Sequence, residues 1–343
     1  MERDGEQTDP WGAPGDIRAM GAEMLGSLAQ PAPEQTNGPA RRRSGGRRQI
    51  WRLLRPMLYV AVAAGVFAGG WSAHAAFRGG SSPSSTDELT EALVPQDGLT
   101  LDVQWGDVPV RLVQQGVVDL QKFEVAARSA GFPLTSDQLD VLEQGSDYPL
   151  QVDSNNAYFI LDVLWALGLA NSNAILTQGA IAQYERPGDL ASTGGWTIGA
   201  KPGEQYLAAL ELIKLTPQQQ DVVEEVVAHA YRPCCANMAA FPDCNHGMAA
   251  LGLAELMASQ GASADDIFSA LKKISPFWFP AQYHHLGLYF QGQGQQWDQV
   301  DARTVMGAEY SSASGWKQVA ASLQQQGVLT GGSGGSKASG CSP

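Results

Sequence analysis

The segment from Tyr231 to Leu253, YRPCCANMAAFPDCNHGMAALGL, holds the residue types most able to do chemistry, including three of the four cysteines of the chain. Its candidate ligands are Cys234, Cys235, Cys244 and His246, with a secondary set of His229, Met238 and Met248. Three cysteines and one histidine form a complete tetrahedral ligand set for zinc. The same side chains suit an iron–sulfur cluster with mixed ligation, or copper with help from the secondary set. This Cys/His segment therefore predicts one metal centre, and the residue types leave its metal open.

Two predicted helices flank the ligands and must position them. Thr216 to Arg232 forms the first, with Pro217 as its first helical residue, and Asn245 is expected to cap a second helix that runs to Gln260. In the middle of a helix, Cys244 and His246 would point about 200° apart, so their joint use requires both to lie in the non-helical turn that enters the helix. The N-terminus of a helix also favours a thiolate. We therefore expect a helical hairpin with the ligands gathered at one end.

A disulfide is the alternative use of these cysteines, because an oxidising compartment favours it. Neighbouring Cα atoms lie about 3.8 Å apart, below the usual disulfide range of about 4.4 to 6.8 Å, so Cys234–Cys235 is the least favoured pair. Cys244 paired with either one would close a loop of about 10 residues. The remaining thiol could then pair with Cys341 in the C-terminal tail. Metal binding, disulfides and a thiol redox role all stay open at this point.

Parts of the Cys/His segment resemble known motifs. The Pro-x-Cys order followed by histidine resembles the three-cysteine, one-histidine motif of the CDGSH (NEET) iron–sulfur proteins, although Cys234 and Cys235 are adjacent here. Cys244-x-His246-Gly247 resembles half of a Rieske loop, without the second Cys/His pair. Together with the STGGW loop, the segment also resembles a family of exported, membrane-anchored prokaryotic proteins from about residue 90 onward. The two iron–sulfur motifs match only in part, so neither family's cluster is carried over to this chain. The third resemblance implies export and brings no activity with it.

The N-terminal part of the chain predicts export. Seven arginines between positions 41 and 55 precede Met57 to Phe77, which contains no Asp, Glu, Lys or Arg. About 20 uncharged residues suffice to cross a bilayer as a helix, and flanking arginines stay in the cytoplasm. We therefore expect a single-pass anchor at the cell membrane with a cytoplasmic N-terminus and an extracytoplasmic body. The small residues Ala73 and Ala75 allow cleavage near Ala75 and secretion instead, and Arg47 to Arg52 resembles a twin-arginine signal.

Charge limits the partners of this body. The chain carries a net charge of −13, and from Ala76 onward 13 basic residues stand against 28 acidic ones. Such a surface repels nucleic acid, which excludes that class of partner. The expected partners are the membrane itself and other subunits of a membrane complex.

Periodicity and caps predict a mainly α fold with a single helical domain. The expected regions are a disordered cytoplasmic tail (1–49), a basic flank with a transmembrane or signal segment (50–77), a linker (78–85), a helical extracytoplasmic domain (86–328) and a flexible Gly/Ser tail (329–343). The stretch AYFILDVLWALGLA after Asn156 is apolar nearly all round and predicts a central buried helix. Another helix is expected over Glu204 to Leu215. Strand signals are confined to Leu99 to Gln104 and Tyr148 to Val152.

The remaining candidate segments give weaker evidence of a functional site. Tyr184 to Gly203 is too long and glycine-rich for a simple connector, so it is either a surface loop with Trp196 packed down or a lid over the Cys/His segment. His284 and His285 lie in an aromatic-rich stretch typical of packed side chains. No catalytic triad order, HExxH or dinucleotide fingerprint is present, so no catalytic residue is assigned. The sequence predicts an extracytoplasmic metal or iron–sulfur protein for electron transfer or metal handling, with a disulfide-stabilised subunit of a membrane complex as the alternative.

Overall fold

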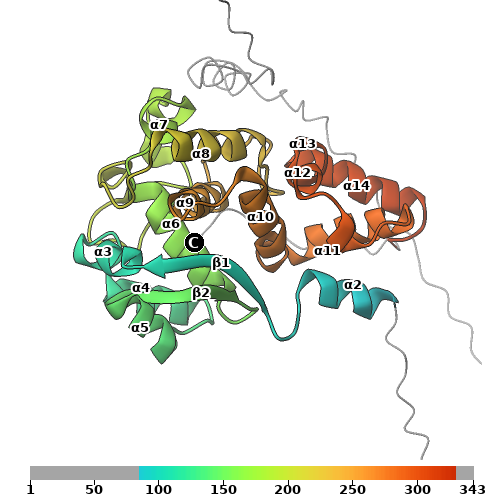
Figure 1. Cartoon of the computed structure of the whole chain (residues 1–343), viewed down its shortest axis with the longest axis horizontal. Coiled ribbons are helices and arrows are strands. Elements are labelled where there is room, and N and C mark those ends of the chain that lie inside the picture. Colours follow the sequence, from blue (N-terminus) through green and yellow to red (C-terminus); the bar gives the residue numbers. More distant parts are fainter. Residues whose placement is uncertain (1–84, 330–343) are drawn as a thin grey trace, which may run out of the picture. The chain divides into compact units, whose positions relative to one another are not determined.

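The computed structural model describes residues 85–329, and this part of the chain is mainly helical (Figure 1). The predicted tail, the anchor or signal segment, nearly all of the linker and the Gly/Ser tail beyond residue 329 lie outside the described residues. Within 85–329, no helix is both long and apolar enough to cross a membrane. The α-helices are α2 (Ser85–Leu93), α3 (Val108–Gln114), α4 (Leu120–Ser129), α5 (Ser136–Gln144), α6 (Ala157–Ala170), α7 (Ala174–Thr177), α8 (Pro217–His229), α9 (Asn245–Ser259), α10 (Ala264–Trp278), α11 (Pro280–Gly292), α12 (Ala302–Met306), α13 (Ala308–Ser311) and α14 (Ala313–Gln325).

Helices α6 and α9 pack against each other at the centre of the core (Figure 1). Twelve of the fourteen residues of α6 are buried, which confirms the central helix predicted from its apolar composition. Gly168 of α6 and Gly252 of α9 let the two backbones touch. A Cβ atom on Gly168 would lie 2.1 Å from the Met248 carbonyl oxygen, and one on Gly252 would lie 2.2 Å from the Leu164 carbonyl oxygen. This close contact sets the position of the first turn of α9 along α6.

Local capping explains where several helices begin. Thr135 and Thr216 each complete a capping box at the start of α5 and α8, and Asp119 accepts the backbone N–H of Lys122 at the start of α4. The start of α8 agrees with the predicted one. Pro217 occupies the first position of α8, where its missing N–H costs no hydrogen bond.

The two strand signals form one antiparallel pair. Strand β1 (Leu99–Gly106) pairs with β2 (Ser146–Val152), and Leu101 lies opposite Leu150. Alternate residues of β1 are buried, as expected for a strand with one face on the core. Strand β1 contacts α9, so the small sheet lies against the helix that carries two of the candidate ligands.

The predicted helix over Glu204 to Leu215 is wrong. Only a short 3₁₀ turn, η3 (Gly203–Gln205), forms there. The following backbone bonds to the end of α6 instead of to itself: the N–H groups of Ala208 and Leu210 donate to the carbonyls of Leu169 and Ala170. The side-chain oxygen of Asn171 accepts two further N–H groups, those of Leu212 and Ile213. These bonds satisfy carbonyls left open at a helix C-terminus, so a tertiary contact overrides the local helix propensity.

Candidate metal centre

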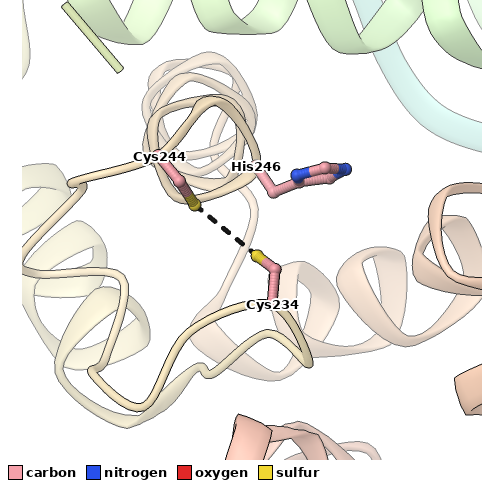
Figure 2. Close-up of side chains that lie close together, drawn as sticks. All are labelled: Cys234, Cys244 and His246. Carbon is pink, nitrogen blue, oxygen red and sulfur yellow. Dashed lines mark hydrogen bonds between the residues drawn. The ribbon is translucent and has the colours of Figure 1, made fainter. Parts of the chain in front are cut away.

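The candidate ligands lie where the chain passes from α8 to α9. Helix α8 ends at His229 and packs along α9, and the connecting loop carries Cys234 and Cys235. Figure 2 shows Cys234 approaching from this loop, while Cys244 and His246 come from the start of α9. The predicted gathering of ligands at one end of a helix pair is confirmed.

The four predicted ligands form two overlapping groups. The Sγ atoms of Cys234 and Cys244 lie 3.7 Å apart and point toward each other (Figure 2). Cys235 Sγ lies 3.5 Å from Cys234 Sγ. Ligand atoms of Cys234, Cys244 and His246 all lie within 4.8 Å of one another, as do those of Cys235, Asp243 and Cys244. This geometry can hold a metal ion, with Cys244 common to both groups.

Cys244, rather than Asn245, is the N-cap of α9, so the predicted cap is off by one residue. Cys244 has an extended backbone, and its Sγ accepts the N–H of Gly247 at 3.4 Å. Asn245 is already helical, and its side-chain oxygen accepts the N–H of His246. The prediction that Cys244 and His246 both lie in the non-helical entry turn holds for Cys244 alone, because α9 begins at Asn245 and His246 is already helical. The partial positive charge at the start of α9 favours a thiolate at Cys244.

A buried arginine lies among the three sulfur atoms. Arg232 is only 4 % exposed, and its Nε donates to Cys244 Sγ at 3.2 Å. Its terminal nitrogens bond to the carbonyls of Asn237 and Phe241 and pair with the carboxylate of Asp243. Burial opposes the charged form, but the three cysteines and Asp243 together raise the pKa of Arg232 above its ordinary value. By the same interaction, the guanidinium stabilises negative charge on the sulfur atoms.

Two neighbours hold this arginine in place. Asn237 donates to the second oxygen of Asp243 at 3.0 Å, which orients the carboxylate toward Arg232. Gly247 leaves room for the guanidinium, because a Cβ atom there would lie 2.7 Å from an Arg232 nitrogen. A larger residue at this position would displace the guanidinium.

His246 connects the sulfur cluster to an aromatic cavity of about 300 Å³. Its ring lies 4.3 Å from the ring of Phe279, measured between centroids, and 6.1 Å from that of Trp278. His246 and Asn245 form part of the cavity wall, and Asp162 of α6 is the only Asp or Glu side chain in that wall. Burial raises the pKa of Asp162 to about 7, and the charge of His246 partly offsets this effect.

Protein-family models, curated proteins and solved structures give no match to this chain. What the site can bind is therefore inferred from the geometry of its own residues.

The secondary candidates come from the end of α8, the connecting loop and α9. His229 Nδ1 lies 2.8 Å from the Glu225 carbonyl oxygen in its own helix, and it belongs to neither group. Met248 is fully buried within α9, and Met238 lies in an isolated bridge with Tyr231. His284 and His285 are half-buried in α11, where burial lowers the pKa of both. They also lie outside both groups, as expected for packed side chains.

The glycine-rich loop lies against the site. The N–H of Ser192 donates to the Asp243 carbonyl at 3.1 Å, and Trp196 is buried with its indole N–H bonded to the Val117 carbonyl. The prediction that Trp196 packs down is confirmed. Gly195 to Ile198 also line the cavity beside His246, so the loop covers part of it. Opening of this loop as a lid stays a prediction.

Sequence reasoning missed Arg232 and Asp162. Arg232 was assigned only to the end of a helix, although it immediately precedes the Pro233–Cys234 step. Asp162 had a clearer signal, because it is the only charged residue in the apolar stretch that forms α6. A single carboxylate in a buried helix is costly unless it serves a site.

Proposed function

We propose that this protein binds one thiophilic metal ion through Cys234, Cys244 and His246, with Cys235 available as a fourth ligand. The observation that carries the proposal is the spacing of the ligand atoms. Tetrahedral coordination with Zn–S bonds of about 2.3 Å separates two sulfurs by about 3.8 Å. The 3.7 Å between Cys234 and Cys244 and the 3.5 Å between Cys235 and Cys234 are close to this value. Two sulfurs in van der Waals contact lie about as far apart, so the nearby imidazole is an essential part of the argument.

The compact spacing favours a single ion over an iron–sulfur cluster. All ligand atoms of the first group lie within 4.8 Å of one another. A [2Fe–2S] cluster distributes its four protein ligands over two irons and needs a wider cage. Zinc and copper both accept a cysteine and histidine set of this size, so they are the metals we propose.

Charge also supports a bound cation. Zinc with three thiolates and a neutral imidazole has a net charge of −1, and a buried charge needs a partner. Arg232 supplies the opposite charge and donates directly to Cys244 Sγ. The guanidinium also favours the deprotonated sulfur that a metal requires.

The proposed role is metal handling outside the membrane. Cys234 and Cys235 are half-buried, whereas Cys244 and His246 are buried. An ion can therefore enter and leave on the side of the loop while the α9 ligands stay fixed. The same proposal holds that residues 57–77 anchor the protein in the membrane and that the body lies outside the cell. Electron transfer is a second role if the ion is copper, since zinc has no redox chemistry.

A disulfide-stabilised scaffold is the competing function, and the same sulfur pair supports it. Side-chain rotation could bring Cys234 and Cys244 from 3.7 Å to the S–S bond length of about 2.05 Å. Such a bond would remove two ligands from the site, so the two functions exclude each other in one molecule.

Metal analysis of the full-length protein, purified without oxygen, separates the two. We expect about one equivalent of zinc or copper, and a large loss of metal in Cys244→Ser and His246→Ala. His229→Ala is the matched control, because it removes a histidine that lies outside both ligand groups. An absorption spectrum identifies an iron–sulfur cluster by its colour. Metal-free protein whose Cys234 and Cys244 thiols are blocked in a disulfide would refute the proposal.

A further inference from the structure

The cavity beside His246 has walls made largely of aromatic rings. Trp165, Trp196 and Trp278 lie in its wall, and each indole N–H is already bonded to a backbone carbonyl: those of Ser192, Val117 and Ala157. These side chains therefore have no hydrogen-bond donor left for a ligand. What they offer is apolar ring surface, which binds other rings and organic cations.

The outer part of the cavity is also aromatic. Phe132 and Tyr158 line it, stack with centroids 5.0 Å apart and are each 45 % exposed. Large apolar side chains that are exposed next to each other are typical of a surface that binds a ligand or a partner. These two rings therefore form a solvent-exposed part of the cavity wall.

One acidic side chain lies in this apolar wall. Among residues 85–329, no donor forms a hydrogen bond with the carboxylate of Asp162, and no arginine or lysine lines the cavity. Asp162 is half-buried, and the charge of His246 offsets only part of the cost of its burial. A bound ammonium group would add a second positive charge and supply the missing hydrogen bonds.

We propose that this cavity binds a small organic amine, with an aromatic or other apolar body between the rings and a protonated amino group on Asp162. The volume of about 300 Å³ lies at the small end of ligand pockets and suits one ring with a short chain. Binding of the amine depends on the cavity and not on the metal. Its position next to the metal ligand His246 rests on the proposed function, which would make the amine a neighbour of the bound ion.

Three ligands of similar shape test the head group. Phenethylamine, phenethyl alcohol and hydrocinnamate share a phenyl ring and a two-carbon chain but carry a positive, neutral or negative group. Calorimetric titration of reduced full-length protein, prepared free of detergent, should show phenethylamine binding about tenfold or more tightly than the alcohol. Hydrocinnamate should bind most weakly. No binding by any of the three, or tighter binding of hydrocinnamate, would overturn the proposal.

Two variants locate the binding. Asp162→Asn should remove the preference for the amine over the alcohol while the alcohol still binds, and an unchanged preference would overturn the assignment of Asp162. Phe132→Ala changes an exposed residue at the outer end of the cavity, so folding should persist while all affinities fall.

A metal-site variant keeps this proposal separate from the previous one. Cys234→Ser should lose metal and keep the amine preference. If the preference disappeared together with the metal, the amine would be a partner of the metal and not of Asp162, which would refute the assignment. Failure to find any metal in the native protein, with the amine preference intact, would refute the proposed function alone.

Discussion

Replacing Asp162 by asparagine should stabilise the protein at neutral and higher pH. In the unfolded chain this carboxyl has an ordinary pKa of about 4, whereas burial raises it to about 7 in the fold. Below about pH 4 the group is protonated in both states and costs nothing. As the pH rises from about 4 to about 7, the unfolded chain ionises first, so the folded state loses stability. Above about pH 7 the loss is complete.

The shift sets the size of the effect. It amounts to about 3 pKa units at about 1.4 kcal/mol each, or about 4 kcal/mol. Asp162 is half-buried and faces a cavity that water can enter, so part of this is screened. We expect Asp162→Asn to raise the free energy of unfolding by about 2 to 4 kcal/mol at about pH 8, and to leave it nearly unchanged at about pH 4.

Urea unfolding of reduced, metal-free protein, followed by circular dichroism, measures both values. Asp221→Asn is the matched control, because it makes the same substitution at an exposed aspartate on α8. Comparing each variant with the native chain at the same pH cancels the contribution of all other groups. An equal effect of Asp162→Asn at the two pH values would refute the claim that burial controls this carboxyl.

Three further variants test the packing of the site. Arg232→Met should lower the free energy of unfolding by about 3 kcal/mol in urea titrations, because Asp243 and Cys244 lose a buried charged partner; a change of a few tenths would contradict this. Gly247→Ala should displace the Arg232 guanidinium, lower the free energy of unfolding by about 1 to 3 kcal/mol and weaken zinc binding in a competition assay. The control is Gly292→Ala, at a helical glycine with open space around it, which should neither lower the stability nor weaken zinc binding. Glu255→Gln should increase stability at about pH 8 and not at about pH 4, since burial raises the pKa of Glu255; a gain at both pH values would point to packing instead.

Local patterns in the sequence predict much of this fold. The apolar composition of α6, the capping boxes of α5 and α8 and the alternation in β1 all act within a few residues, so sequence alone identifies them. The segment after Gly203 behaves differently. Its hydrogen bonds go to the end of α6 and to Asn171, more than 30 residues earlier in the chain. No local signal specifies such partners, and the predicted helix fails there.

The residues of the candidate metal centre also differ in how far the sequence predicts them. Helical phase alone excludes the middle of a helix for Cys244 and His246 as joint ligands, and Cys244 is the non-helical N-cap of α9. The charges around them depend on tertiary packing. Arg232 becomes buried only because the loop folds back over α9, and Asp162 reaches the cavity from α6, a helix more than 60 residues away in the sequence. Ligand types are therefore predictable from the sequence, whereas the groups that balance their charge are not.

X-ray absorption of the metal-loaded full-length protein tests the central claim most directly, because it counts the atoms bound to the ion. We predict a shell of two or three sulfurs at about 2.3 Å and one nitrogen at about 2.0 Å, with one sulfur lost in Cys244→Ser. A shell of oxygen and nitrogen alone, or the same spectrum in the native protein and in Cys244→Ser, would contradict a metal centre built on Cys234, Cys244 and His246.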